Sequence, residues 1–261
     1  MQFAVIGNPV AHSLSPILHN SAFLRLGIDG FYGRYLLENA KDFMGLKKLN
    51  LQGANVTVPY KEVAFNACDE VFGIAKEIKA VNTLVFKENK IFGYNTDAPG
   101  FYECIESFDF KKALIIGAGG SAKALACILR EKGFDIEIVN RSQGRLEDFK
   151  KQDFVCYEAS AYIPKKYDIV INTTPAGLTQ DSLPLEREKL VEVLKGCKLA
   201  FDLIYGKNTP FLNLAKELKI PSLDGKNMLI NQAVLAFVIF MENFNRNFDR
   251  ELLRKTMQST I

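Results

Sequence analysis

The chain has 261 residues, of which 48% are hydrophobic and 24% charged, as expected for a globular protein with one large domain or two medium ones. The net charge is only +3 with lysines spread along the chain, which argues against nucleic-acid binding, and no apolar run approaches the roughly 20 residues that a membrane span needs. Five scattered cysteines, none in a C-x-x-C pair, and only two histidines argue against a disulfide framework and against a metal site.

The start of the chain predicts an α/β unit. A strand-like run, FAVIG, precedes the segment SPILHNSAFLRLG, which predicts a helix with Ser15 as the N-cap, Pro16 in the first helical position and Gly27 as the stop. Because Met1 leads directly into a strand, without the basic start and cleavage site of a secretory signal, we expect a cytoplasmic protein.

The next informative stretch is NVTVPYK, residues 55–61. As a strand it would send the polar residues Asn55 and Thr57 to one face and the valines to the other. Lys61 follows where the strand must end, just beyond a proline.

A hairpin and a boundary follow. Within residues 80–96 the segment VNTLVFKENKIFGYNT predicts two strands around a Glu-Asn turn, which indicates a mixed sheet. The segment NTDAPGF, residues 95–101, then carries a proline and a glycine before a helix, and we place the domain boundary there.

The second half has a regular alternation of strands and helices. Continuous apolar strands are expected at 113–117, 136–140, 168–172 and 199–204, with helices between them, which predicts a Rossmann-like parallel sheet covered on both faces. From about residue 225 the chain is expected to be helical and able to pack back on the first domain.

A glycine-rich turn predicts dinucleotide binding. Gly117, Gly119 and Ala122 have the G-x-G-x-x-A spacing between a strand and a helix, where backbone amides can bind a pyrophosphate. The next strand ends at Asn140, where an NAD site would keep an acid, but the sequence continues with NRSQGR. Arg141 and Arg145 can bind a 2′-phosphate there, so NADP is favoured over NAD.

Further polar residues cluster in short stretches. The loop NTTPAGL, residues 172–178, could close over the nicotinamide with Thr173 and Thr174. The first half and the C-terminal segment carry Ser13 and Ser15, Asn55 and Thr57 with Lys61, Asn82 with Thr83, Asn95 with Thr96 and Asp97, and Gln232. Each alone has an ordinary explanation as a cap, a turn or a surface charge. Together, hydroxyls and amides with one cation suit a small polyhydroxylated acid.

These stretches carry a specific resemblance. NPVAHSLSP, GANVTVPYK, AVNT, GYNTD, GAGGSAKA, NRS, NTTPAG, DLIYGKNTP and DGKNMLINQA occur in the order found in shikimate dehydrogenases, from about residue 7 to residue 233. The sequence is therefore similar to that family over nearly its whole length.

The resemblance implies a two-domain α/β enzyme that reversibly reduces 3-dehydroshikimate to shikimate with NADP, in the shikimate pathway to chorismate and the aromatic amino acids. It implies a substrate-binding and catalytic domain, residues 1–100 completed by C-terminal helices at 228–261, and an NADP-binding domain, residues 101–227, with the active site in the cleft between them. Lys61 is the implied acid/base residue and Asp97 its partner. The implied substrate residues are Ser13, Ser15, Asn55, Thr57, Asn82, Tyr205 and Gln232. The implied cofactor residues are Gly117, Gly119, Gly120, Ser121, Asn140, Arg141, Ser142, Arg145, Thr173, Thr174, Gly225 and Met228.

Three positions depart from the family pattern: Ser142 stands where threonine is usual, Ala98 where glycine is common, and Lys207 where proline is frequent. Three alternatives bear on function. A quinate or dual-specificity dehydrogenase would share the fold, a catalytically silent NADP- or shikimate-binding regulator would not need Lys61 and Asp97, and a methyltransferase would want an acid near Asn140. We expect a monomer or a homodimer, with no metal, no nucleic acid and no membrane as partner.

Overall fold

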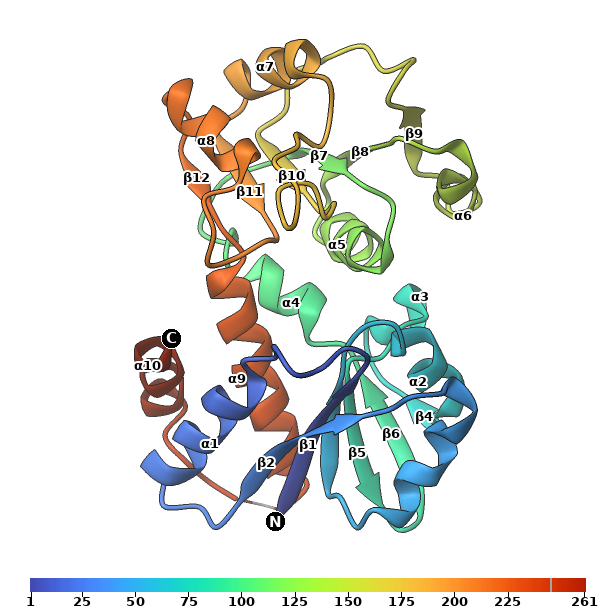
Figure 1. Cartoon of the computed structure of the whole chain (residues 1–261), viewed down its shortest axis with the longest axis vertical. Coiled ribbons are helices and arrows are strands. Elements are labelled where there is room, and N and C mark those ends of the chain that lie inside the picture. The colour runs from blue at the N-terminus through green and yellow to red at the C-terminus, as the bar shows by residue number, and fades with distance from the viewer. Residues whose placement is uncertain (245) are drawn as a thin grey trace. The chain divides into compact units, whose positions relative to one another are not determined.

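Residues from both ends of the chain fold together. The computed structural model describes residues 1–244 and 246–261, and these form two units (Figure 1). Unit 1 comprises Met1–Phe101 and Leu229–Ile261, and unit 2 comprises Tyr102–Met228. The chain therefore leaves unit 1 once and returns to it through one long helix.

Unit 1 is built on a six-stranded mixed sheet, as the hairpin in the sequence predicted. Its spatial order is β2-β1-β3-β5-β6-β4, and β5 runs antiparallel to both of its neighbours. Glu88 and Asn89 form the hairpin turn with φ of 52° and 60°, the left-handed values that a two-residue turn needs. The strands are β1 Gln2–Gly7, β2 Phe31–Leu36, β3 Gly53–Val56, β4 Glu70–Val71, β5 Thr83–Lys87 and β6 Lys90–Tyr94.

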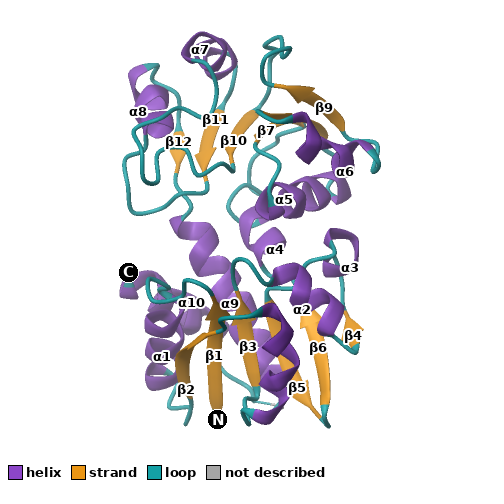
Figure 2. Ribbon diagram, turned by 45° about the vertical axis from the view of Figure 1, so that its right-hand side comes forward, coloured by secondary structure: helices purple, strands orange, loops and turns teal. Residues whose placement is uncertain are grey.

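Helices cover both faces of this sheet (Figure 2). The expected stop of the first helix is confirmed, because Gly27 follows it with φ of +64°. The expected N-cap is wrong by one position: Leu14 is the cap residue and Ser15 is the first helical residue. The helical segments are α1 Ser15–Arg25, η1 Ala40–Lys48, α2 Lys61–Ala67, α3 Ala75–Ile78, α4 Asp97–Tyr102, α9 Lys226–Glu242 and α10 Arg250–Thr260.

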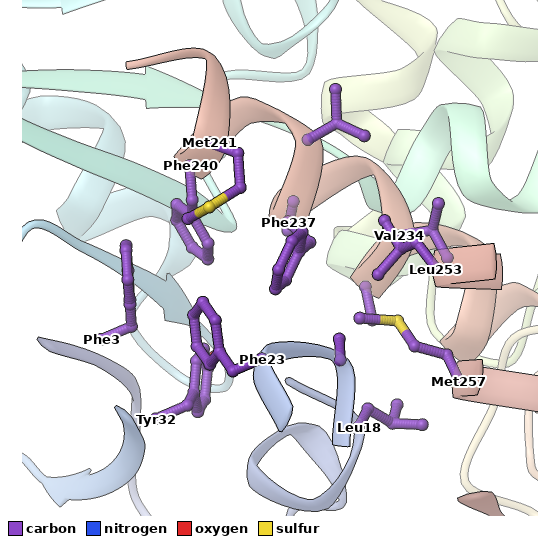
Figure 3. Close-up of a cluster of buried hydrophobic side chains, with 14 of the residues drawn as sticks. Phe3, Leu18, Phe23, Tyr32, Val234, Phe237, Phe240, Met241, Leu253 and Met257 are labelled. Carbon is purple, nitrogen blue, oxygen red and sulfur yellow. The ribbon is translucent and has the colours of Figure 1, made fainter. Parts of the chain in front are cut away.

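The larger core of unit 1 lies between the sheet and helices α1, α9 and α10 (Figure 3). Aromatic rings fill it: Phe3 lies 5.5 Å from Phe23 and 4.8 Å from Phe240 between ring centroids, and Phe23 lies 5.0 Å from Phe237. Contacts of this kind stabilise a core beyond the burial of their area. They fix α9, and with it the C-terminal segment, against the first strand of the chain.

The predicted strand through residues 55–60 ends earlier than expected. β3 stops at Val56 and all four of its residues are buried, because both faces of the sheet are covered. Ala54 and Val56 belong to one core cluster, while Asn55 hydrogen-bonds Tyr32 of the other. Thr57 remains tied to the sheet, since its amide donates to the Ile6 carbonyl at 2.8 Å, and the Val58-Pro59 peptide bond that follows is cis. Lys61 therefore begins α2 instead of ending a strand.

Unit 2 contains an all-parallel sheet of order β12-β11-β10-β7-β8-β9, the predicted Rossmann-like arrangement. The strand order reverses between β7 and β10, and in such sheets ligands bind beside the carboxyl ends of the strands at this point. Helices α7 and α8 pack on one face of the sheet. Helix α5 also has a buried apolar side that packs on the sheet. The strands are β7 Lys112–Ile116, β8 Asp135–Asn140, β9 Val155–Glu158, β10 Ile169–Asn172, β11 Leu199–Asp202 and β12 Ser222–Leu223. The helical segments are α5 Gly120–Glu131, η2 Gln143–Leu146, α6 Glu147–Lys150, α7 Arg187–Lys195 and α8 Pro210–Glu217.

None of the helices in the described part of the chain combines the length and the apolarity that a bilayer crossing needs. Cys68, Cys156 and Cys197 are free thiols. Burial raises the pKa of Cys156 and of Cys197 to about 11 each, so neither is a reactive thiolate near neutral pH.

A histidine is enclosed in the core of unit 1. His19 on α1 is fully buried, and its ring stacks on Tyr32 with 4.3 Å between centroids and 3° between planes. Neither ring nitrogen has a hydrogen-bond partner in the described structure, and burial lowers the pKa of His19 to about 3. The folded protein therefore holds a neutral imidazole that behaves as an aromatic side chain.

We expect this histidine to make folding sensitive to acid. The unfolded chain takes up the proton near pH 6.5 and the folded chain only near pH 3, so stability present at neutral pH is lost as pH falls between these values. At about pH 4.5 the loss should amount to about 2.5 kcal/mol. Urea unfolding of the wild type and of His19→Phe at about pH 7 and about pH 4.5 measures it. The same pH slope in both proteins would contradict the assignment.

Candidate functional site

Two serines mark the start of the site in unit 1. Ser13 and Ser15 lie at the beginning of α1, and their hydroxyl oxygens are 3.3 Å apart. Ser15 is buried, its amide donates to the Ser13 hydroxyl at 3.3 Å, and the first turn of α1 carries no acidic residue. Hydroxyls at the positive end of a helix dipole can bind an anion such as a carboxylate.

A buried network of amides lies in the middle of the sheet. The Asn55 side chain accepts from the Tyr32 hydroxyl at 2.6 Å and donates to the Asn82 carbonyl at 3.2 Å and to Thr83 Oγ1 at 3.0 Å. The Asn82 side chain in turn donates to Thr96 Oγ1 at 3.0 Å and accepts from the Thr96 amide at 2.8 Å. Both amides are therefore held in one orientation by the protein, because each has donors and acceptors on the correct sides.

The tyrosine of this network was missed by sequence reasoning, because an aromatic residue in a strand is normally a core residue. Tyr32 is 1% exposed and stacks on His19. Burial raises the pKa of its hydroxyl well above the usual value, while hydrogen bonding with Asn55 and with the Ser15 side chain acts in the opposite direction. The hydroxyl therefore stays protonated and donates to Asn55.

Lys61 and Asp97 form an ion pair. Lys61 Nζ lies 2.6 Å from Asp97 Oδ2, and the two side chains remain 26% and 17% exposed. Each is the first residue of a helix, α2 for the lysine and α4 for the aspartate. Asn95 fixes the start of α4, since its side-chain oxygen accepts from the amides of Asp97 at 3.1 Å and Ala98 at 3.2 Å. The pair is thus rigidly placed and partly open to solvent.

Gln232 is brought to the same unit by the return of the chain. It lies on α9, is 9% exposed, and donates to the Leu229 carbonyl at 2.8 Å. A Cβ at Gly100 would lie 2.7 Å from the Gln232 amide nitrogen, so the glycine allows α4 to approach α9 closely. The helices that carry Asp97 and Gln232 are therefore in direct contact.

The glycine turn of unit 2 fits a dinucleotide phosphate. Gly117 follows β7 with φ of +116°, a conformation that side chains rarely adopt, and a Cβ there would overlap Thr173. Gly119 is the N-cap of α5, and the space where Gly119 and Gly120 would carry a Cβ is open. Together with Ser121 in the first turn, this leaves the amides of a twelve-residue helix available to an anion.

The loop after β8 carries two arginines that are candidates for binding a phosphate. The Asn140 side chain donates to the Ser142 carbonyl at 2.9 Å and to its hydroxyl at 3.2 Å, which closes the loop on itself. Arg141 and Arg145 are both exposed, and neither has an ion-pair partner among the residues that the structure describes. A guanidinium pair without acids fits a 2′-phosphate.

Two loops of unit 2 are joined by residues that sequence reasoning did not select. Asp202 is fully buried and accepts from Asn172 at 3.0 Å and from the Thr209 hydroxyl at 2.6 Å. Asn172 accepts from the hydroxyl of Thr174 at 2.7 Å, and Thr173 Oγ1 donates to the Ile116 carbonyl at 2.8 Å. The two threonines are thus fixed at the carboxyl ends of β7 and β10. Two motifs gave a signal for this network: NTTPAG, which begins with Asn172, and DLIYGKNTP, which begins with Asp202 and includes Thr209.

Three remaining candidates also lie in unit 2. Tyr205 follows β11, and burial raises the pKa of its hydroxyl. Gly225 packs against the Leu203 carbonyl so closely that a Cβ would overlap it, and Met228 lies on the first turns of α9. The predicted substrate residues therefore all belong to unit 1 except Tyr205, and the predicted cofactor residues all belong to unit 2.

No group of three or more metal-ligating side chains was found in the described ranges 1–244 and 246–261. The polar groups in both units are instead hydroxyls, amides and single charges. These suit organic ligands that carry hydroxyl, carboxylate and phosphate groups.

Comparison with known proteins gives the family. A model described as the shikimate dehydrogenase substrate binding domain matches residues 5–84, and one described as shikimate / quinate 5-dehydrogenase matches residues 102–203. A shikimate dehydrogenase (NADP(+)) of Helicobacter hepaticus is 49% identical over 97% of this chain and 95% of its own length. The Thermus thermophilus shikimate 5-dehydrogenase, solved with NADP(H) and shikimate, superposes with a TM-score of 0.86 at 32% identity, covering 100% of both chains. The Aquifex aeolicus shikimate dehydrogenase gives a TM-score of 0.87 at 31% identity, covering 98% of this chain and 97% of its own.

A Rossmann-like unit with a glycine turn after a strand, together with a mixed-sheet unit that carries hydroxyls, amides and a lysine–aspartate pair, is typical of an NADP-dependent oxidoreductase of hydroxy acids. The chain belongs to the shikimate dehydrogenase family. Its reaction is the reversible NADP-dependent reduction of 3-dehydroshikimate to shikimate in the shikimate pathway, EC 1.1.1.25.

Proposed function

We propose that Lys61 is the acid/base residue of this reaction and that Asp97 is its partner. The observation that carries the proposal is the 2.6 Å ion pair, partly open to solvent and set beside a network of hydroxyls and amides that could hold a cyclic polyol. In the same unit Lys47 also pairs with an aspartate, at 3.2 Å, but it lies on a turn of η1 without such a network. The surroundings therefore favour Lys61 as the reacting cation.

The mechanism follows from where charge develops. Bound NADPH supplies the hydride that the ketone carbon receives. Negative charge then grows on the carbonyl oxygen, and the Lys61 ammonium stabilises this charge and donates a proton to it. Asp97 holds the ammonium in place and can accept from a neighbouring ring hydroxyl. In the reverse direction neutral Lys61 accepts the hydroxyl proton.

We assign the other residues by the groups that each can bind. Ser13, Ser15 and Thr57 offer hydroxyl donors for the carboxylate, and Asn55, Asn82 and Gln232 offer amides for the ring hydroxyls, with Tyr205 completing the substrate set. Gly117, Gly119, Gly120 and Ser121 offer the pyrophosphate turn. Asn140, Arg141, Ser142 and Arg145 bind the adenosine 2′-phosphate, and Thr173, Thr174, Gly225 and Met228 line the nicotinamide pocket. Residues 1–100 with 228–261 would then form the substrate domain and residues 101–227 the NADP domain.

The experiment measures NADPH or NADH formation with shikimate or quinate as substrate and NADP or NAD as cofactor. We expect turnover with shikimate and NADP, and at most weak turnover with quinate, whose additional ring hydroxyl needs a further partner. Equal turnover of both acids would make the enzyme a dual shikimate/quinate dehydrogenase. Absence of turnover with every pair would favour a silent binding protein.

We also propose that the enzyme acts in the cytoplasm as a monomer or a homodimer. Cys68, Cys156 and Cys197 carry thiols, which suits a reducing compartment. Cell fractionation and light scattering of the purified protein test location and assembly separately.

A further inference from the structure

Arg34 is a cation of unit 1 that is not among the proposed catalytic, substrate or cofactor residues. Arg34 is exposed on the edge strand β2, and its Nη2 donates to the main-chain carbonyl of Ser13 at 2.7 Å. No acidic side chain within the described ranges 1–244 and 246–261 pairs with it. A guanidinium has five N–H donors and this bond uses one of them. Arg34 therefore brings an uncompensated positive charge to the serine loop.

The position of Arg34 on strand β2 explains why its positive charge lies beside the Ser13 loop. β2 runs parallel to β1, with Arg34 opposite Val5, and residues two apart on a strand share a face. Tyr32 lies on the same face and donates its hydroxyl to Asn55 at 2.6 Å. One face of β2 thus contributes both a buried hydroxyl to the amide network and a cation to the Ser13 loop.

The serine site lacks a full charge of its own. Ser13 and Ser15 are neutral, and the start of α1 contributes only partial positive charge, reduced by Pro16, which has no amide hydrogen. Shikimate and 3-dehydroshikimate each carry a carboxylate. A cation beside neutral donors strengthens binding of such an anion and accelerates its encounter.

We propose that Arg34 is a binding residue for the substrate carboxylate and that it acts through its positive charge, which the hydrogen bond to the Ser13 carbonyl holds beside the serines. The inference rests on the proposed role of Ser13 and Ser15. Because Arg34 hydrogen-bonds the Ser13 carbonyl and contacts neither Lys61 nor Asp97, it contributes to capture of the acid and leaves the proton-transfer step unchanged.

The test compares Arg34→Gln, Arg34→Lys and the matched control Arg25→Gln. Arg25 is an exposed arginine in the last turn of α1, the helix that begins at Ser15. It lies about 15 Å from that start by the rise of 1.5 Å per residue. The measured quantities are kcat and KM for shikimate at saturating NADP, and KM for NADP, at low salt and at about 1 M salt, where the screening length is only about 3 Å.

We expect Arg34→Gln to lower kcat/KM for shikimate about fivefold at low salt, entirely through KM, with the KM for NADP unchanged. The difference from wild type should nearly vanish at high salt. Arg34→Lys keeps the charge and should recover most of the loss, while Arg25→Gln should match the wild type. The salt dependence separates charge from a mere bracing of the loop, which high salt would not mask.

An unchanged KM in Arg34→Gln, a loss confined to kcat, or the same loss in Arg25→Gln would each overturn the proposal. A loss that persists equally at high salt and in Arg34→Lys would show that Arg34 only supports the Ser13 loop and does not act through its charge. The double variant Ser13→Ala, Ser15→Ala separates the proposed role of Arg34 from the assignment of the carboxylate to the two serines. If its KM for shikimate rises while that of Arg34→Gln does not, only the role of Arg34 fails, and if neither rises, the carboxylate assignment fails with it.

Discussion

Replacing Lys61 by methionine lowers kcat for shikimate oxidation by about a thousandfold, since general acid/base catalysis typically contributes 10²–10⁴. The KM for shikimate should change much less, because the serines and amides that hold the acid stay in place. Methionine keeps most of the length of the lysine side chain and removes the ammonium that lies 2.6 Å from Asp97. Steady-state assays of NADPH formation give both constants.

The chain offers a close control for this variant. Lys47 is 22% exposed against 26% for Lys61, and it also pairs with an aspartate of unit 1, Asp69 at 3.2 Å. Lys47→Met should therefore lose a comparable surface ion pair, worth about 0–1 kcal/mol, without losing activity. Comparable kcat values in the two variants would remove Lys61 from the mechanism and leave the enzyme class untouched.

Replacing Arg141 and Arg145 together by alanine raises the KM for NADP about a hundredfold. Charge-assisted hydrogen bonds are worth about 1.5–3 kcal/mol each, and the exposure of both side chains places the sum at the lower end, about 3 kcal/mol. The KM for shikimate should stay within about twofold, since both arginines belong to unit 2 and the serines and amides to unit 1. Activity with NAD, which has no 2′-phosphate, should stay unchanged.

The matched control for the arginine pair is Arg187→Ala. Arg187 is exposed on α7 of the same unit and pairs with Glu217 at 3.0 Å, so its loss tests the general effect of removing a surface guanidinium. A parallel rise of the KM for NADP and for NAD in the double variant would show that these arginines bind a part common to both cofactors, and the 2′-phosphate assignment would be wrong.

Much of unit 2 could be predicted because its signals are local. The strands β7, β8, β10 and β11 are continuous apolar runs bounded by helical segments, and a parallel sheet buried on both faces requires such runs. The edge strands β9 and β12 were not predicted. β12 has two residues and β9 has no buried residue, so neither carries the apolar pattern that marks a buried strand.

Unit 1 was predicted less completely because its elements depend on distant contacts. The strand over residues 55–60 was expected from alternation, yet β3 ends at Val56, and the Thr57 amide beyond it is held by the Ile6 carbonyl. Ser15 was expected as the cap of α1, but its side chain is buried beside Ser13 instead of bonding a free amide of the first turn. In both places tertiary contacts override the local preference.

The sequence by itself determined the composition of the site: a glycine turn after a strand, an arginine pair in place of an acid, and a lysine and an aspartate among hydroxyls and amides. Each of these is a local pattern whose chemistry depends on residue type and spacing. Only the tertiary structure decided which residues meet. It pairs Lys61 with Asp97 across 36 positions, sets Tyr32 on Asn55, and brings Arg34 to Ser13. Such contacts depend on strand order and on helix packing, which residues far apart in the chain specify jointly.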